Sequence, residues 1–257
     1  MSRQRVLWPL ALGLLASPLL AQAQAAPTPV GTWRFQATPY VWMSGLQGNV
    51  RPLPQAPRVA VDKSFSELMD SLEGAAFLTA TARRDDWVLQ ADLSHARTAD
   101  SVALPYGLAA RTRVQQDSVS LTAGRALSND AGNGIDLLAG LRYWNVRASV
   151  AVPGLGSARS TTAVLDPVAA VRWRKVLGPR LSSLAYAEVG GFGLGSERST
   201  QWLLLANYHW RPQAVVSLGY RHQHLDYRDD GKQLDLRLSG PMLGVTWLFD
   251  RGRLMPL

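Results

Sequence analysis

The chain is built from short segments in which apolar and polar residues alternate. The clearest run of them lies between Leu181 and Phe249, where four such segments follow one another with short turns between them. In a β-strand every second side chain points to the same face, so the alternation predicts antiparallel strands with one apolar and one polar face. Each segment keeps the pattern over roughly ten residues, the length that a tilted strand needs to cross a bilayer.

The same pattern recurs upstream and brings the expected number of strands to ten, an even number. The predicted strands cover residues 32–44, 75–84, 87–98, 112–127, 135–150, 161–175, 181–197, 199–210, 214–230 and 234–249. Short links follow Arg84, Leu127, Val176 and Trp210, and longer links follow Ser44, Thr98, Val150 and Arg228. This asymmetry is typical of bacterial outer-membrane barrels, so the sequence predicts an all-β, antiparallel transmembrane β-barrel. Eight or twelve strands also fit, because residues 45–61 could form an extra hairpin and the link at Glu197 is very short.

A short helix is predicted in the first long loop, residues 45–72. Prolines and glycines mark the start of this loop, and residues 58–61 could add a short strand. Ser64 and Glu67 then have the spacing of a capping box, and Leu68 and Met69 follow with helical spacing. Such a helix can fold over the barrel mouth or lie on the surface beside the barrel.

The last predicted strand contains a change in the parity of its apolar residues. They are even-numbered in its first half and odd-numbered in its second: Leu234, Leu236 and Leu238, then Leu243, Val245, Trp247 and Phe249. A regular strand cannot turn both sets toward lipid, because every second side chain shares a face. We therefore expect a β-bulge or bend at Gly240-Pro241.

Tryptophan rings prefer the membrane–water interface, so their positions give an independent indication. Five of them fall at strand ends next to the short turns or the termini: Trp33, Trp87, Trp173, Trp210 and Trp247. The others that follow the leader are Trp42 and Trp202, near the opposite strand ends, and Trp144, between the two ends. The first group predicts an aromatic girdle on the periplasmic side, which favours a membrane barrel over a soluble β-sandwich.

The first residues of the sequence and its composition indicate a protein that is exported from the cytoplasm. Residues 1–26 read as a secretory signal peptide, with Arg3 and Arg5 before an apolar run and small residues at the expected cleavage site, so residues 27–257 form the barrel domain. The chain has no cysteine, and therefore no disulfide or thiolate metal site. Removing two arginines from the 27 basic residues leaves 25 against 19 acidic ones. For an exported protein this excess favours lipopolysaccharide and other anionic surface polymers as partners over nucleic acid.

Several stretches resemble an uncharacterised family of Gram-negative outer-membrane β-barrel proteins. They are TPYVW at 38–42 with Gly45 and Gly48, SFSELMDSL at 64–72, VGGFGLGS at 189–196, GYR at 219–221, DY at 226–227 and GPMLG at 240–244. The resemblance implies a barrel in the cell outer membrane, inserted by the barrel-assembly machinery, and it implies no particular activity.

Six charged residues fall on the faces assigned to the barrel interior: Asp92, Arg142, Arg172, Arg174, Glu188 and Arg221. A basic residue facing lipid near the membrane centre costs about 2 to 4 kcal/mol, so an inward orientation is strongly favoured. Inside a narrow barrel such groups either pair across the lumen and close it or line a small polar channel. We expect Glu188 to pair with at least one of Arg142, Arg172 and Arg221.

A second candidate site lies on one strand, where His222, His224 and Asp226 share a face. This spacing can bind a metal or pair an imidazole with a carboxylate, but it also describes a polar rim above the lipid. The sequence identifies no third partner, so we assign no catalytic, metal or cofactor residues. It favours a non-enzymatic barrel, structural or weakly pore-forming for small solutes. The alternative is a surface enzyme, such as a lipid A or peptide hydrolase, or an adhesin acting through the outer loops.

Overall fold

The computed structural model describes residues 31–51, 58–103, 109–130, 132–154, 156–229 and 231–250. Within these ranges the chain forms antiparallel strands and one short helix. Their bounds are β1 (Arg34–Trp42), β2 (Gly45–Arg51), β3 (Val59–Lys63), α1 (Phe65–Asp70), β4 (Leu72–Arg84), β5 (Trp87–Ala103), β6 (Ala109–Asp130), β7 (Asn133–Val152), β8 (Gly156–Gly178), β9 (Leu181–Gly191), β10 (Arg198–Arg211), β11 (Ala214–Asp229) and β12 (Lys232–Asp250).

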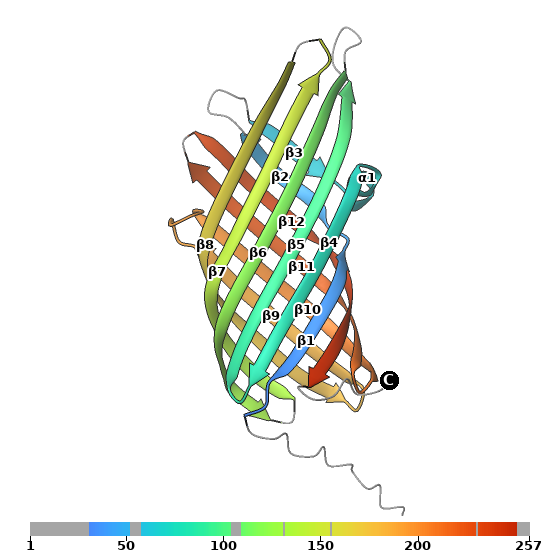
Figure 1. Cartoon of the computed structure of the whole chain (residues 1–257), viewed down its shortest axis with the longest axis vertical. Coiled ribbons are helices and arrows are strands. Elements are labelled where there is room, and N and C mark those ends of the chain that lie inside the picture. The colour runs from blue at the N-terminus through green and yellow to red at the C-terminus, as the bar shows by residue number, and fades with distance from the viewer. Residues whose placement is uncertain are drawn as a thin grey trace, which may run out of the picture.

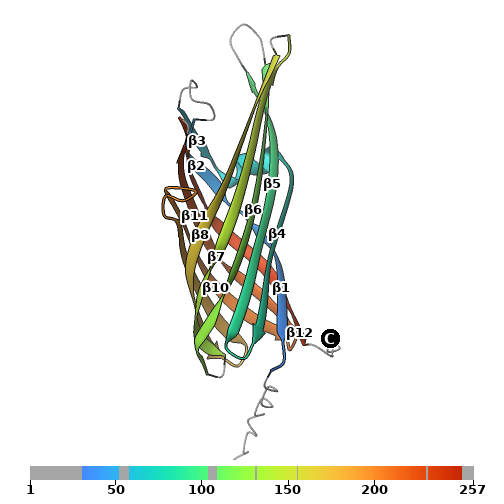
Figure 2. The same cartoon turned by 60° about the vertical axis from the view of Figure 1, so that its left-hand side comes forward.

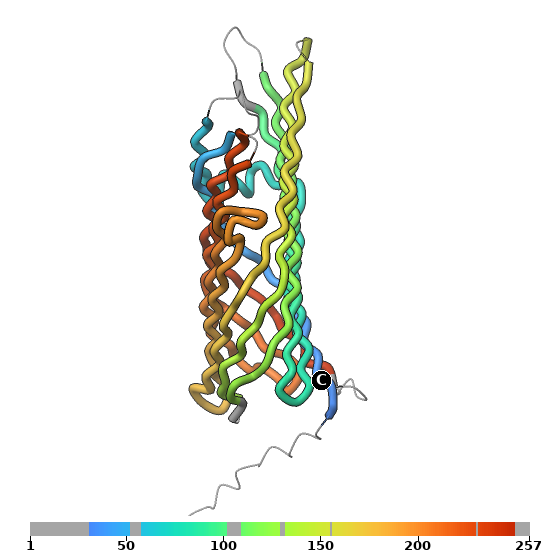
Figure 3. The backbone as a smooth tube through the Cα atoms, turned by 90° about the vertical axis from the view of Figure 1, so that its left-hand side faces the viewer, coloured from blue at the N-terminus to red at the C-terminus, as the bar shows by residue number. Residues whose placement is uncertain are grey.

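Ten of these strands close into a barrel. In the order β1, β4, β5 and on to β12 each strand pairs with the next, and β1 pairs with β12 to complete the circle (Figure 1). The predicted fold class and the number of ten wall strands are therefore confirmed. Closure pairs the backbone of every wall strand on both sides, which is what a sheet needs in order to cross hydrocarbon. The chain enters β1 and leaves β12 at the end with the short turns (Figure 3).

β2 and β3 form a hairpin where we expected mainly a loop. β2 continues the line of β1 along β12, because Trp42 is opposite Met242 and Gly45 is opposite Ser239 in the same register. β3 pairs with β2, so the hairpin extends the wall at the long-loop end without becoming part of the closed circle.

The helix α1 follows this hairpin and has the predicted capping box. The backbone N–H of Ser64 donates to Glu67 Oε2 at 2.7 Å, and the backbone N–H of Glu67 donates to Ser64 Oγ at 3.4 Å. None of its residues is buried, and it lies beside the wall at the long-loop end (Figure 1). This is the second of the two placements considered. Among the described residues no helix is long and apolar enough to cross a membrane.

The strands β5 to β8 extend well beyond the others at the long-loop end (Figures 1 and 2). β6, β7 and β8 contain 22, 20 and 23 residues, about twice the number needed to cross a bilayer. The long links expected after Val150 and Arg228 are therefore wrong. At both places the chain continues as paired strands and turns within a few residues, between Val152 and Gly156 and between Asp229 and Lys232.

The two faces of the wall follow the predicted alternation. On β7, Leu137, Leu141 and Tyr143 are exposed on the exterior, whereas Asp136 and Arg142 are buried inside. Exposed apolar side chains recur in the same way on the other wall strands. A closed barrel with an apolar exterior band is stable when lipid surrounds it, so the protein is an outer-membrane β-barrel.

The tryptophans divide between this exterior and the interior. Trp87, Trp173, Trp210 and Trp247 are exposed at the short-turn end, as a periplasmic girdle requires. Trp202 is exposed toward the other end. Two further rings do not fit the expected belts. Trp42 and Trp144 are buried, because both are even-numbered residues on strands whose even positions face the interior.

The bulge expected at Gly240-Pro241 is absent, and that prediction is wrong. β12 pairs with β11 in one continuous register from Lys232 to Trp247, with Gly240 opposite Arg221 and Pro241 opposite Tyr220. The physical reason is that the first set of leucines does not face lipid: Leu234, Leu236 and Leu238 are buried in the interior. One regular strand therefore satisfies both halves of the pattern, with its early leucines inward and its later apolar residues outward.

Candidate functional site: the barrel interior

An ion pair inside the barrel joins β7 and β9, the two neighbours of β8. Arg142 Nη1 and Glu188 Oε1 lie 2.8 Å apart, and both side chains are 1% exposed. The Tyr186 hydroxyl donates to the second carboxylate oxygen of Glu188 at 2.5 Å. The alternation of β7 and β9 turns these groups inward, and burial in a confined space makes pairing necessary, because an isolated buried charge is costly. The expected pair between Glu188 and Arg142 is present.

Arg221 is the centre of a second polar group. Its guanidinium donates to Asp92 Oδ1 at 2.8 Å and to Gln201 Oε1 at 2.7 Å, and it also donates to the Tyr40 hydroxyl. Asp92 accepts further hydrogen bonds from Thr79 at 2.8 Å and from Tyr40 at 3.2 Å. These five side chains come from five strands, so the group links a large part of the circumference.

A third group lies nearer the short-turn end, around Asp136. Arg172 donates to its carboxylate at 2.8 Å, Arg174 lies 3.6 Å from it, and Arg83 also contacts it. All six residues predicted to face the lumen therefore do so, and they fall into three groups. We did not single out Asp136 or Arg83 from the sequence. Parity would have found both, since Asp136 shares a face with Arg142, and Arg83 shares a face with Thr79 and Thr81 on the predicted strand 75–84.

The outer part of the interior is apolar, which the sequence analysis did not predict. We define the apolar plug as Trp144, Val164, Leu225, Tyr227, Leu234 and Leu236. Trp144 and Leu225 are each 1% exposed, and Leu46 and Val50 of β2 pack against the cluster. Its members come from β7 and β8 on one side and from β11 and β12 on another. The plug therefore lies in the interior between the ion pairs and the long-loop end.

On the other side of the ion pairs the interior contains a cavity of about 300 Å³. Asp92 and Arg221 line its inner end, Arg172 and Arg174 line it nearer the short-turn end, and it continues past Asn207 to His209, which is exposed at the short-turn end. The cavity thus opens toward the periplasmic side and ends against the polar groups. The lumen thus contains a cavity on the short-turn side of the ion pairs and a packed apolar cluster on the long-loop side.

The histidine cluster lies on the exterior of β11, above the lipid-facing band. His222 Nδ1 is 2.6 Å from Ser239 Oγ, and His224 Nε2 is 3.0 Å from Asp235 Oδ1. Asp226 accepts from Arg228 instead of pairing with either imidazole. The three residues share a face, as expected, but each has a different partner. In the part of the chain that the structure describes, no group of three or more acidic, histidine or cysteine residues could hold a metal ion.

Comparison with known proteins gives a likeness in fold only. No protein-family model matches the sequence, and a search of curated proteins finds no match. Among solved structures, the translocator domain of the autotransporter NalP from Neisseria meningitidis is 14% identical, with a TM-score of 0.49, over 87% of this chain and 90% of that one.

Two further similar structures have other roles. The outer membrane protease OmpT from Escherichia coli is 10% identical, with a TM-score of 0.45, over 85% of this chain and 97% of that one. An outer membrane channel from Pseudomonas putida F1 is 10% identical, with a TM-score of 0.40, over 87% and 97%. A translocator, a protease and a channel give no common activity, so the function must be argued from the residues of this chain.

Proposed function

We propose that the protein is a closed, non-enzymatic outer-membrane barrel with a structural role, and that its lumen does not conduct ions. The sequence left two roles open, a structural one and a weakly pore-forming one, and the filled interior supports the structural role. The observation that carries this proposal is the apolar plug, in which Trp144 and Leu225 are almost completely buried. An ion crossing this region would have to leave its water behind, and apolar constrictions block conduction in that way.

The ion pairs below the plug support the same proposal. A ten-strand barrel is only slightly wider than one that side chains fill completely. Arg142 of β7 with Glu188 of β9, and Arg221 of β11 with Asp92 of β5, place buried side chains in that narrow space. Each of these two pairs has no net charge, so they form a barrier and not a charged path.

The alternative role with an observation in its favour is adhesion. The hairpins β5–β6 and β7–β8 project beyond the band that lipid covers and offer paired strands to the medium (Figure 2). A surface hydrolase is less well supported, because the imidazoles of His222 and His224 have different hydrogen-bond partners, Ser239 and Asp235. An activity screen on lipid A and peptide substrates, with His222→Ala as the comparison, separates the enzyme from the two non-enzymatic roles.

Conductance in planar bilayers tests the closed lumen. The folded wild-type barrel should give no discrete current steps. A variant that trims the apolar plug and removes one of the two ion pairs, Trp144→Ala and Leu236→Ala with Arg142→Ala and Glu188→Ala, should give them. The matched control is Leu141→Ala, which trims an exposed exterior leucine and should behave as wild type. Because a damaged barrel could leak non-specifically, each sample is first shown to be folded by its different gel migration before and after boiling. Regular steps from the wild-type barrel would contradict the proposal.

A further inference from the structure

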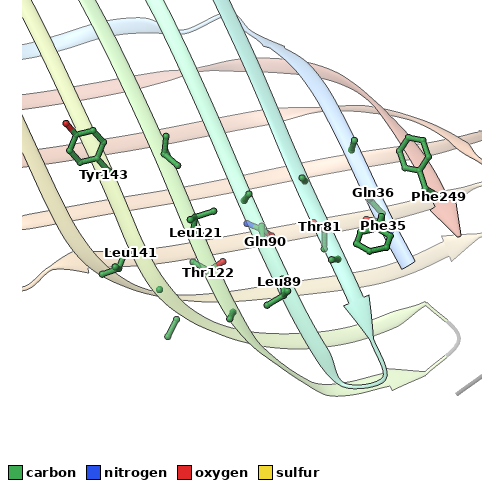
Figure 4. Close-up of a pocket in the computed structure, with 18 of the residues that line it drawn as sticks. Phe35, Gln36, Thr81, Leu89, Gln90, Leu121, Thr122, Leu141, Tyr143 and Phe249 are labelled. Carbon is green, nitrogen blue, oxygen red and sulfur yellow. The ribbon is translucent and has the colours of Figure 1, made fainter. Parts of the chain in front are cut away.

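The exterior of the wall has an apolar trough of about 870 Å³ on the side formed by β1 and β4 to β8. Its floor consists of small residues such as Ala80, Ala91 and Ala123, and larger side chains including Phe35, Leu121 and Tyr143 stand along it (Figure 4). The trough faces the membrane, so the material that fills it must be hydrocarbon. Its end toward the long loops is the row formed by Val119, Tyr143 and Leu165, which are neighbours on β6, β7 and β8.

Arginines lie outward of this row on the same exterior face, beyond a polar row that contains His95, Asp117 and Asn145. On β5 the position after Leu93 and His95 is Arg97, and on β7 the position after Tyr143 and Asn145 is Arg147. Each is four residues beyond the last apolar residue, roughly 13 Å along the strand. We define the basic face by its exterior arginines on β5 to β8: Arg97, Arg111, Arg113, Arg147 and Arg159.

Only part of this positive charge is neutralised by the protein. Glu73 lies 2.6 Å from Arg97 and 3.7 Å from Arg113, and Asp117 lies 3.7 Å from Arg147. Among the described residues of this face, two carboxylates therefore contact three of five arginines. The guanidinium groups remain accessible, since the Arg113 and Arg147 side chains are 64% and 50% exposed.

The described residues of β11 and β12, on the other side of the barrel, show no comparable excess. On β11 and β12 the exterior positions at this level carry both signs, with Asp235 beside Arg237 and Asp226 beside Arg228. The combination of an apolar trough below and excess positive charge above is thus specific to β5 to β8. A ligand that matches it must have hydrocarbon chains attached to an anionic headgroup.

We propose that this face binds a phosphorylated glycolipid of the outer leaflet, the lipid A part of lipopolysaccharide, with its acyl chains against the outer end of the trough and its phosphates on the basic face. Guanidinium groups bind phosphate through paired, charge-assisted hydrogen bonds. Their long side chains can also reach back toward the membrane surface from a position above it. This site is separate from the lumen and does not depend on the lumen being closed.

A groove beside the basic face provides contacts for the sugar of such a headgroup. It has a volume of about 640 Å³, with Arg111 and Arg113 on the wall strands and Glu67 and Asp70 on α1 among its lining residues. Carboxylates accept hydrogen bonds from sugar hydroxyls, and arginines donate to phosphates. The exposed helix α1 thereby acquires a role as one wall of the headgroup site.

Binding of lipid A with and without its phosphates tests the proposal. The folded barrel in phosphatidylcholine nanodiscs is titrated with each form, and bound lipid is counted by native mass spectrometry. The test variant is Arg113→Gln with Arg147→Gln, and the matched control is Arg228→Gln with Arg237→Gln on the other side. All four arginines are exposed, so none of these changes should prevent folding, and gel migration verifies this.

We expect the wild type and the control variant to prefer phosphorylated lipid A, and the test variant to bind it about thirtyfold more weakly, since an arginine near an anionic membrane surface contributes about a factor of five. Equal binding of both lipid forms by the wild type would overturn the proposal, and so would equal losses in the two variants. A soluble sulfated polysaccharide or inorganic phosphate that displaced the lipid at low concentration would instead identify a general polyanion surface and would also overturn it.

Discussion

Single buried charges determine how the lumen is filled. Glu188 accepts from Arg142 of β7 and from Tyr186 of its own strand, and Asp92 accepts from Arg221 of β11 and Tyr40 of β1. Taking two such charges out of water is costly, and the pair repays that cost only while both partners are present. The charged residues that close the lumen are therefore also those whose individual replacement should destabilise the barrel most.

Replacing Glu188 by glutamine should destabilise the barrel by about 3 kcal/mol, because Arg142 would stay buried without its counter-charge. Replacing both residues by methionine should cost much less than the two single changes added together, since no charge is then left alone. Urea unfolding in lipid vesicles, followed by gel migration, measures each free energy. Additive losses in the double variant would show that the two side chains do not interact.

The alternation of residues along each strand was enough to assign these side chains to the interior, but it did not show which of them form pairs. The alternation on β7 and β9 assigned Arg142 and Glu188 to the interior, because a strand has only two faces. Which arginine meets which carboxylate depends on strand tilt and on the stagger of the barrel, and neither is visible in one sequence. For this reason Arg172 joined Asp136 and Arg83 instead of Glu188.

Among the secondary-structure elements, β12 shows how an irregular pattern can arise from a regular strand. It pairs with β2 along its outer half and with β1 along its inner half, and the change of partner falls at Gly240. A Cβ atom on Gly240 would lie 2.1 Å from the carbonyl oxygen of Met43, in the link between β1 and β2. The glycine thus permits a close backbone approach and not a bulge.

Gly240→Ala should therefore destabilise the folded barrel by ~2 kcal/mol, the cost of forcing an extra carbon into a packed site. Gly74→Ala is the matched control, because a Cβ there would meet nothing within 4 Å. Thermal unfolding of the two variants, compared with wild type, measures the difference. Equal melting temperatures for all three would show that the link between β1 and β2 adjusts freely.

The helix α1 depends on its capping box, since none of its residues is buried. Ser64→Ala should accelerate hydrogen exchange of the α1 amides by roughly fivefold, the effect of an average lost N-cap. The wall strands should keep their exchange rates and serve as the internal control. Unchanged exchange in α1 would show that other contacts maintain the helix.

Acidification should weaken the same helix. Hydrogen bonds from the Ser64 hydroxyl and backbone hold the pKa of Glu67 below its usual value. A carboxyl whose pKa is lowered on folding stabilises the structure when the pH is above its unfolded value, and that contribution is lost as the pH falls through the folded pKa. Glu67→Gln should remove this pH dependence, as measured by exchange corrected for the intrinsic rate.

The motif predicted α1 well because a capping box is a local signal. The hairpin of β2 and β3 was harder to recognise, because its strands are short and β2 owes its place to β12, which is distant in sequence. The lengths of β5 to β8 were underestimated for another reason. Beyond the membrane the alternation of apolar and polar residues along these strands is weaker, because both faces of the strands contact water and neither has to be apolar.

On the scale of the whole molecule, the even number of strands and the exterior apolar band were sufficient to predict a closed barrel, since open edges do not survive in lipid. The apolar plug could not be predicted in the same way. Leu234 and Leu236 look like lipid-facing residues until the parity of the entire strand is fixed, and their contacts with Trp144 join parts of the chain that are far apart. The account that results is a filled outer half and a cavity that opens only toward the periplasm.

Sided labelling of single cysteines tests this account most directly, because the chain contains no cysteine of its own. Asn207→Cys places a thiol in the cavity, and Ser101→Cys places one on the exposed surface of the long-loop end. A bulky maleimide that cannot cross the outer membrane is added to intact cells, and then to cells whose outer membrane has been disrupted. The account predicts that the thiol at 101 reacts in both cases and the thiol at 207 only after disruption. Labelling of the thiol at 207 in intact cells would contradict it, since the reagent would then have passed through the interior from outside.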